Sequence, residues 1–82
     1  MLFCMTTEQR TSALLAEVRA EMARRGDNLS DLATATGISQ ASLSRKLRGE
    51  TALLVTEALL ICDALHVTLP TLLRRIDEIA AA

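Results

Sequence analysis

A cationic segment near the middle of the chain carries side chains whose chemistry is suited to reading bases. From Gly37 to Gly49 the sequence is Gly-Ile-Ser-Gln-Ala-Ser-Leu-Ser-Arg-Lys-Leu-Arg-Gly, with three cations and no acidic residue. Guanidinium and amide groups can form paired hydrogen bonds with guanine and adenine, and small side chains let a helix lie close to the base edges. The segment therefore predicts a helix that fits the major groove of DNA.

The spacing of the apolar residues divides this segment into two faces. Leu43 and Leu47 are four residues apart and therefore share one face of a helix. At about 100° per residue, the opposite face carries small and basic side chains, namely Ala41, Ser42, Arg45 and Arg48. Ser39 is placed to cap the first turn, which contains Gln40. We expect the two leucines to be buried and the basic face to be open to solvent.

Two further helices are predicted before this segment. Thr6 and Gln9 fit a capping box, and the helix that follows is expected to run for about 18 residues, until Gly26. Asn28 is the next N-cap candidate, and it begins a short helix that ends at the first glycine of the cationic segment. Two short helices joined by a turn of about three or four residues form a helix-turn-helix, here over residues 28–49.

Two more helices are predicted in the C-terminal part of the chain. The first begins either near Thr51 or near Leu54, and its core positions by spacing are Val55, Leu59, Ile61, Cys62 and Leu65. Thr68 can cap the last helix, expected over residues 68–80. The apolar stripe of that helix is Leu69, Leu72, Leu73, Ile76 and Ile79. Its opposite face, which includes Arg75, is expected to be solvated.

Length and composition predict a single all-α domain of five helices. Leu and Ala are abundant in the 82 residues, and no stretch alternates with the period of a strand. The net charge of −1 does not by itself indicate a nucleic-acid partner, so the prediction depends on the local cluster of cations. Cys4 and Cys62 match no metal or redox spacing, and the single histidine, His66, does not complete a catalytic triad. We therefore predict no cofactor, no metal and no enzyme activity.

The location of the protein is predicted from two absences in the sequence. No segment reaches the roughly 20 apolar residues of a membrane-spanning helix. The short apolar start of the chain lacks the basic lead and the length of a secretion signal. The chain is therefore expected in the cytoplasm, with residues 1–5 forming a flexible tail.

The central segment resembles the Cro and phage-repressor type of helix-turn-helix, found in the lambda repressor-like DNA-binding domains. The matching residues are Leu32-Ala33, Gly37-Ile38-Ser39, Leu43, Leu47 and Gly49, followed by the run from Val55 to Leu65, Val67-Thr68 and Leu72. The resemblance extends from Leu15 to Ile76, and its central thirteen residues are the most specific part. It implies a five-helix domain whose third helix enters the major groove.

Carried over residue by residue, the resemblance implies two kinds of DNA contact. Base contacts are implied for Gln40, Ala41, Ser42 and Arg45. Phosphate contacts are implied for Asn28, Ser39, Ser44, Lys46 and Arg48. Leu29 departs from the family pattern because it replaces a Gln that often grips phosphate, and Lys46 and Leu54 replace an apolar residue and a capping Ser or Asp. The first departure puts one phosphate contact in doubt.

The implied partner is double-stranded DNA with a palindromic operator, bound by a homodimer. The predicted dimer interface is the stripe of the last helix, Leu69, Leu72, Leu73, Ile76 and Ile79, joined by Leu2 and Phe3. The alternative is that this stripe only covers the core of a monomer. The predicted function is a sequence-specific transcriptional regulator, of the phage-type or small prokaryotic repressor class. A helical protein-interaction module, such as an antitoxin-like subunit, is the alternative.

Overall fold

The structure is a computed structural model that describes the backbone of residues 6–81 and the side chains of residues 6–78. Five helices make up this part of the chain: α1 (Thr7–Arg25), α2 (Leu29–Thr36), α3 (Gln40–Leu47), α4 (Val55–Ala64) and α5 (Leu69–Ala81). No strand occurs in it, which confirms the predicted all-α fold. The tail predicted for residues 1–5 lies outside the described residues.

The first three helices begin at the predicted capping residues. At α1, Thr6 Oγ1 accepts from the Gln9 amide at 3.1 Å and Gln9 Oε1 accepts from the Thr6 amide at 2.9 Å. Asn28 and Asp31 form the same reciprocal pair at α2, at 2.8 and 3.2 Å. Ser39 Oγ accepts from the backbone of α3. Because these bonds satisfy N–H groups that a helix leaves unpaired, local sequence fixes where each helix starts.

The start of α4 resolves the choice between Thr51 and Leu54 in favour of Leu54, which is its N-cap. Leu54 has no polar side chain to cap the helix, and the Glu57 carboxylate accepts from its amide at 2.9 Å instead. The prediction that Val55 and Leu59 lie in the core is wrong, because they are 72% and 48% exposed. Leu59 lies about 160° around the helix from the buried Ile61, so the two side chains cannot share a face.

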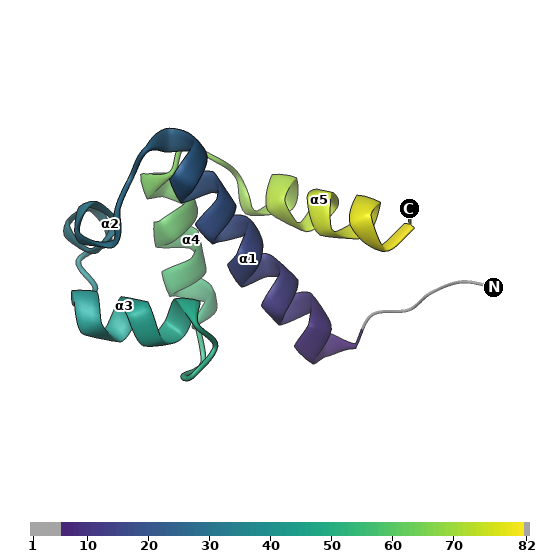
Figure 1. Cartoon of the computed structure of the whole chain (residues 1–82), viewed down its shortest axis with the longest axis horizontal. Coiled ribbons are helices and arrows are strands. Elements are labelled where there is room, and N and C mark those ends of the chain that lie inside the picture. The colour runs from purple at the N-terminus through teal and green to yellow at the C-terminus, as the bar shows by residue number, and fades with distance from the viewer. Residues whose placement is uncertain (1–5, 82) are drawn as a thin grey trace.

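One aliphatic core holds the five helices together. In Figure 1, α2 and α3 lie at one end of the molecule, α4 lies between α2 and α1 in this view, and α5 packs against α1. The side chains that fill the space between the helices are Leu15, Val18, Met22, Leu32, Leu43, Leu47, Ile61, Cys62, Leu65, Leu72 and Ile76. Burial raises the pKa of the Cys62 thiol, so this cysteine is an unreactive core residue.

Ion pairs hold α5 against α1. Arg75 of α5 donates to Glu21 of α1 at 3.0 Å, and Arg24 donates to the same carboxylate at 2.7 Å. Arg10 and Asp77 form a second pair between the two helices. The expectation that the face carrying Arg75 is only solvated is therefore wrong, since Arg75 forms an ion pair with the buried Glu21 on the neighbouring helix.

No single helix among the described residues has the length and apolar character needed to cross a membrane, and only α4 and α5 taken together do, as a pair bent by 97°.

Leu43 is fully buried, so its truncation should destabilise the domain strongly. We expect Leu43→Ala to lower the free energy of unfolding by about 2–5 kcal/mol, from lost burial and from the cavity left behind. Urea denaturation followed by circular dichroism measures the change. The exposed Thr34→Ala on α2 is the control, and equal losses in the two variants would contradict the assigned core.

The carboxylate of Glu21 should make the fold sensitive to acid. Hydrogen bonds from Arg24 and then Arg75 hold the pKa of Glu21 below its usual value in the folded chain. The stabilisation is therefore complete above the unfolded-state pKa and is lost as the pH falls through the folded-state pKa. Glu21→Gln should flatten the acid side of the stability profile measured by urea denaturation. If the free energy of unfolding of Glu21→Gln falls with acid as steeply as that of the wild type, the stabilising role of the Glu21 ion pairs is contradicted.

Candidate nucleic-acid interface

Two leucines anchor α3 in the core. Leu43 is 0% exposed and Leu47 is 4% exposed, and both belong to the core cluster that includes residues of α1 and α4. At the end of the helix, the guanidinium of Arg19 on α1 donates to the Leu47 carbonyl. This bond satisfies a carbonyl that the end of α3 would otherwise leave unpaired. The helix is thus held by packing along one face and by a hydrogen bond at its end.

The face of α3 opposite the leucines is open, as the sequence predicts. Gln40, Ala41, Arg45 and Arg48 are exposed, whereas Ser42 and Ser44 are half-buried. The serines lie about 100° from Leu43 on either side, so they lie at the edges of the outward face and not at its centre. The four predicted base-contacting residues form what we call the outward strip, with Ala41 and Arg45 opposite the leucines and Ser42 at one edge. Gln40 is at the other edge, since it lies only about 60° around the helix from Leu43 but is exposed in the first turn.

The turn between α2 and α3 depends on a glycine and a threonine. Gly37 has φ of 77°, a left-handed conformation that costs a residue without Cβ little. Thr36 is buried; its hydroxyl donates to the Leu32 carbonyl at 2.8 Å and accepts from the Ile38 amide at 3.3 Å. Sequence reasoning missed Thr36, although a Thr directly before the glycine of the turn was visible. These bonds fix the angle at which α3 leaves α2.

The predicted phosphate-contacting residues differ in whether their polar groups already have partners within the domain. Ser39 Oγ accepts from the Ser42 amide at 3.3 Å, and Asn28 Oδ1 accepts from the Asp31 amide at 2.8 Å, so both side chains already cap helices. Arg48 pairs with Glu50 at 2.7 Å, but both side chains are more than half exposed. An exposed pair of this kind is worth little and can exchange for another anion.

Lys46 has a partner that the sequence did not predict. Its ammonium pairs with the Glu57 carboxylate, and each side chain is about one-sixth exposed. Lys46 lies only about 60° around the helix from Leu43, on the side that turns toward α4. Hydrogen bonds from Lys46 and then the Leu54 amide lower the pKa of Glu57. This pair ties α3 to the start of α4 and engages the Lys46 ammonium, which makes Lys46 less available to a DNA phosphate than the exposed Arg48.

Arg45 differs from Lys46 in having no ion-pair partner among the residues that the structure describes. Within residues 6–78, no carboxylate lies at ion-pair distance from its guanidinium. On α1 the Glu21 carboxylate is paired with Arg24 and Arg75, and on α4 the Glu57 carboxylate is paired with Lys46. The chain has a net charge of −1. The outward face of α3 is nevertheless locally cationic.

The stripe of α5 predicted as a dimer interface is divided by the fold. Leu72 and Ile76 are buried in the domain, Leu69 is half-buried and Leu73 is 45% exposed. The side chain of Ile79 and the residues Leu2 and Phe3 lie outside the description. Burial of Leu72 and Ile76 agrees with the alternative that the stripe covers the monomer core.

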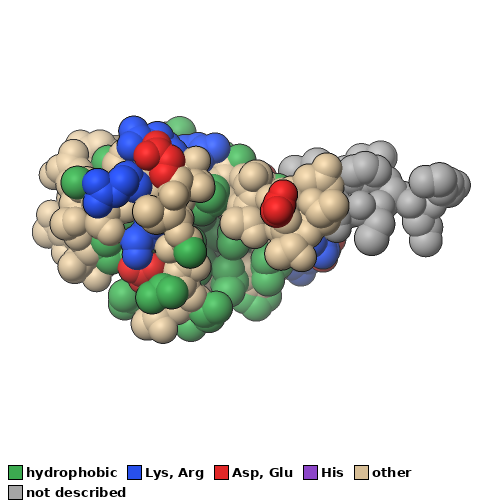
Figure 2. Space-filling model, turned by 90° about the horizontal axis from the view of Figure 1, so that it is seen from below, with side chains coloured by type: hydrophobic (Ala, Val, Ile, Leu, Met, Phe, Trp, Pro, Cys, Tyr) green, Lys and Arg blue, Asp and Glu red, His purple; other side chains and the backbone are tan. Residues whose placement is uncertain are grey.

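Exposed apolar side chains instead gather on α4. We define the α4 apolar face as Leu54, Val55, Leu59 and Leu60, which are all at least 40% exposed. Figure 2 shows hydrophobic side chains along the lower edge of the left-hand lobe and in the hollow beside it, below most of the Lys and Arg side chains of that lobe and next to one acidic and one basic group. Patches of this kind mark surfaces where proteins associate.

Metal binding finds no support in the described part of the chain, where no group of three or more His, Cys, Asp or Glu side chains is placed to hold an ion.

Comparison with known proteins gives one match. The family model of the Cro/C1-type HTH DNA-binding domain matches residues 17–78, which is 62 of the 82 residues. The matched stretch begins within α1 and ends within α5, so it contains α2, α3 and α4 entirely. No curated protein and no solved structure matches the chain.

Proposed function

The chain belongs to the family of Cro/C1-type helix-turn-helix DNA-binding domains, and we propose that it is a sequence-specific transcriptional repressor. In this proposal α3 enters the major groove, and the bound protein occludes promoter DNA. It acts in the cytoplasm, as a prokaryotic repressor or as a phage repressor in the host cell. The observation that carries the proposal is the open, cationic face of α3, held outward by the burial of Leu43 and Leu47.

Each residue of the strip has a chemical role in the proposed complex. The guanidinium of Arg45 can donate two hydrogen bonds to guanine O6 and N7, and Gln40 can pair with adenine N6 and N7. Ala41 can contact a thymine methyl group, and its small side chain lets the helix approach. Ser42 adds a hydroxyl at the edge of the strip. Of these contacts, Arg45 should discriminate most between bases, because a bidentate pair contributes about 1–3 kcal/mol.

Phosphate contacts are assigned to Asn28, Ser39, Ser44 and Arg48. Arg48 lies at the end of α3, and its weak exposed pair with Glu50 leaves it free to exchange the carboxylate for a phosphate. The side-chain Nδ2 of Asn28 lies beside the N-terminus of α2 and is not part of the helix cap, which uses the side-chain oxygen and the backbone amide. Charged contacts of this type release counterions from DNA, so affinity should fall with salt.

We further propose that the protein binds a palindromic operator as a homodimer through the α4 apolar face, assisted by the exposed Leu73. The outward side of the first two turns of α4 carries Val55, Thr56, Leu59 and Leu60 and no charge, and the exposed Asp63 follows on the same side in the third turn. A twofold contact places each residue near its own copy, so an uncharged apolar face avoids like-charge repulsion. Two half-sites about one helical turn apart would then match the two α3 helices.

A second candidate function is a protein-interaction module, such as an antitoxin-like subunit. The exposed apolar side chains of α4 support it, since they offer a surface for a different protein as well as for a second copy. The two candidates differ in which molecule covers that face. They can also coexist in one chain, with α3 on DNA and α4 on a partner.

Substitution of the two arginines of α3 should separate base contacts from phosphate contacts. Arg45→Ala should relax base preference at one operator position, at a cost of about 1–3 kcal/mol there. Arg48→Ala should weaken binding to every sequence and reduce the salt slope by about one. Both variants should stay folded, because both side chains are exposed. Selection from random DNA, followed by mobility shifts at several salt concentrations, measures these effects.

Wild-type protein that enriches no sequence at low salt would overturn the proposed sequence-specific regulator. Enrichment of a palindrome would support both the regulator and the homodimer, whereas a single half-site would contradict the dimer on DNA.

The proposed dimer should depend on the α4 apolar face. Leu59→Glu places a charge beside its own copy in a twofold contact, so the variant should be monomeric at concentrations where the wild type is dimeric. Analytical ultracentrifugation over a concentration series measures this. Ser12→Glu, an exposed position on α1, is the matched control. A wild-type chain that stays monomeric at the highest concentration, both alone and on DNA, would contradict the dimer.

A further inference from the structure

Two cations at the end of α3 are paired with carboxylates in different ways. Arg48 pairs with Glu50, and both of these side chains are more than half exposed. Lys46 pairs with Glu57, and these side chains are only 15% and 16% exposed. Separating a pair that is mostly withdrawn from water leaves an uncompensated charge in a poorly solvated place. The Lys46 ammonium is therefore held by its partner, whereas the Arg48 guanidinium can exchange one anion for another.

The Glu57 carboxylate is fixed from two directions. Its Oε1 accepts from the Leu54 amide at 2.9 Å and so completes the start of α4, where Leu54 offers no polar cap. Its Oε2 accepts from the Lys46 ammonium. The bond from Lys46 and then the bond from the Leu54 amide hold the pKa of Glu57 below its ordinary value. The carboxylate therefore stays ionised at neutral pH, and it cannot follow the lysine away from α4 without giving up the cap.

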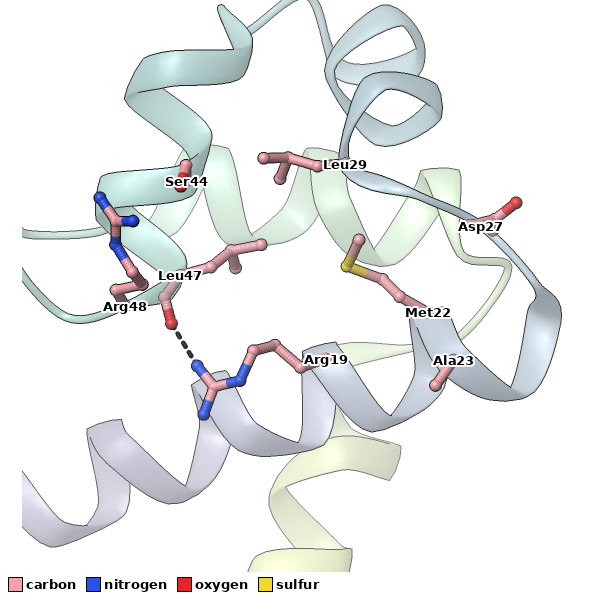
Figure 3. Close-up of a pocket in the computed structure, with 8 residues that line it drawn as sticks. All are labelled: Arg19, Met22, Ala23, Asp27, Leu29, Ser44, Leu47 and Arg48. Atoms are coloured by element: carbon pink, nitrogen blue, oxygen red, sulfur yellow. Dashed lines mark hydrogen bonds between the residues drawn. The ribbon is translucent and has the colours of Figure 1, made fainter.

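The backbone that carries Lys46 is fixed as well. Leu43 and Leu47 are buried, and Figure 3 shows the Arg19 guanidinium of α1 bonded to the Leu47 carbonyl. The backbone of α3 packs against α1 and α2, whereas that of α4 packs against α2 and α5. The Lys46–Glu57 pair adds a direct polar link between α3 and α4. Lys46 can thus leave Glu57 only by a change in its own side-chain conformation.

Lys46 lies on the flank of α3 that meets a phosphate strand when the helix is in the major groove. It is about 100° around the helix from Arg45, so it faces one wall of the groove when Arg45 faces the base edges. The groove is about 12 Å wide and a helix with its side chains measures about 10–12 Å, so the walls lie directly beside the helix. The flexible four-carbon stem of a free lysine reaches a phosphate there.

We propose that Glu57 is a positioning residue that limits the affinity of the domain for DNA of any sequence. Its carboxylate takes the place of a phosphate on Lys46 and withholds this cation from the DNA backbone, an inference that rests on the proposed docking of α3. Sequence-independent affinity comes from cations that neutralise phosphates and release counterions, so each cation withheld lowers it. The base contacts of Arg45 then supply a larger share of the binding free energy.

The test compares Glu57→Gln with the wild type on a random-sequence duplex, by fluorescence anisotropy at several salt concentrations. The Gln amide oxygen can still accept from the Leu54 amide, so the start of α4 is kept, but Lys46 is no longer neutralised. The salt slope should steepen by about one per bound chain, because one more phosphate is neutralised. From 50 to 200 mM salt, Glu57→Gln should then lose about 3.5-fold more affinity than the wild type. A slope equal to that of the wild type would overturn the proposal.

A double variant, Lys46→Gln with Glu57→Gln, removes both charges of the pair. If Glu57 withholds Lys46 from DNA, the double variant should have the wild-type salt slope, because neither chain presents this cation to a phosphate. A slope shallower by about one would mean that Lys46 already contacts phosphate in the wild type, and the proposal would fail. A partly unfolded variant binds more weakly at every salt concentration, whereas the expected result concerns the slope.

Glu78→Gln is the matched control, because it removes the same charge from an exposed position on α5. In Figure 1, α5 runs toward the end of the molecule opposite α3. The control should keep the wild-type slope, and equal steepening in Glu78→Gln and Glu57→Gln would refute a local role for Glu57. The proposed function fails separately: if the wild type selects no sequence, the repressor is overturned, while the slopes on the random-sequence duplex still decide the role of Glu57.

Discussion

The burial of Leu43 and Leu47 is the constraint on which the rest of the structure depends. Their side chains are in the core cluster with residues of α1 and α4, so α3 cannot rotate about its axis without exposing them. The direction of the opposite face follows from the helical period alone. Arg19 fixes the far end of the helix, and Gly37 fixes its entry. A pair of apolar contacts thereby determines which polar side chains meet the solvent.

The charge distribution explains how a chain with a net charge of −1 can present a cationic face. Glu57 is paired with Lys46, and Glu21 is shared by Arg24 and Arg75. These acids stabilise contacts between helices and lie away from the outward face of α3. Net charge sums over the whole surface, whereas a ligand meets only one face of it. For this domain, the charge on the outward face of α3 indicates the kind of ligand better than the net charge does.

Much of the fold could be predicted because its signals are local. Capping residues such as Thr6, Asn28 and Ser39 place helix starts within the same turn, and the four-residue spacing of leucines orients α3. Features that depend on contacts between helices could not be predicted. Spacing alone places Val55 and Leu59 in the core, but Leu59 lies on the side of α4 away from the buried Ile61, and both residues are exposed.

The same distinction applies to the candidate site. The outward strip was visible in the sequence, whereas the pairing of Lys46 with Glu57 and the reach of Arg19 to Leu47 require the tertiary fold. We propose that the outward face of α3 lies in the DNA groove, and NMR cross-saturation from the selected operator shows which residues of the protein lie against DNA. If α3 is in the groove, saturation transfer is strongest at residues 40, 41 and 45. Transfer that is strongest at α4 or α5, with little at α3, would contradict this docking.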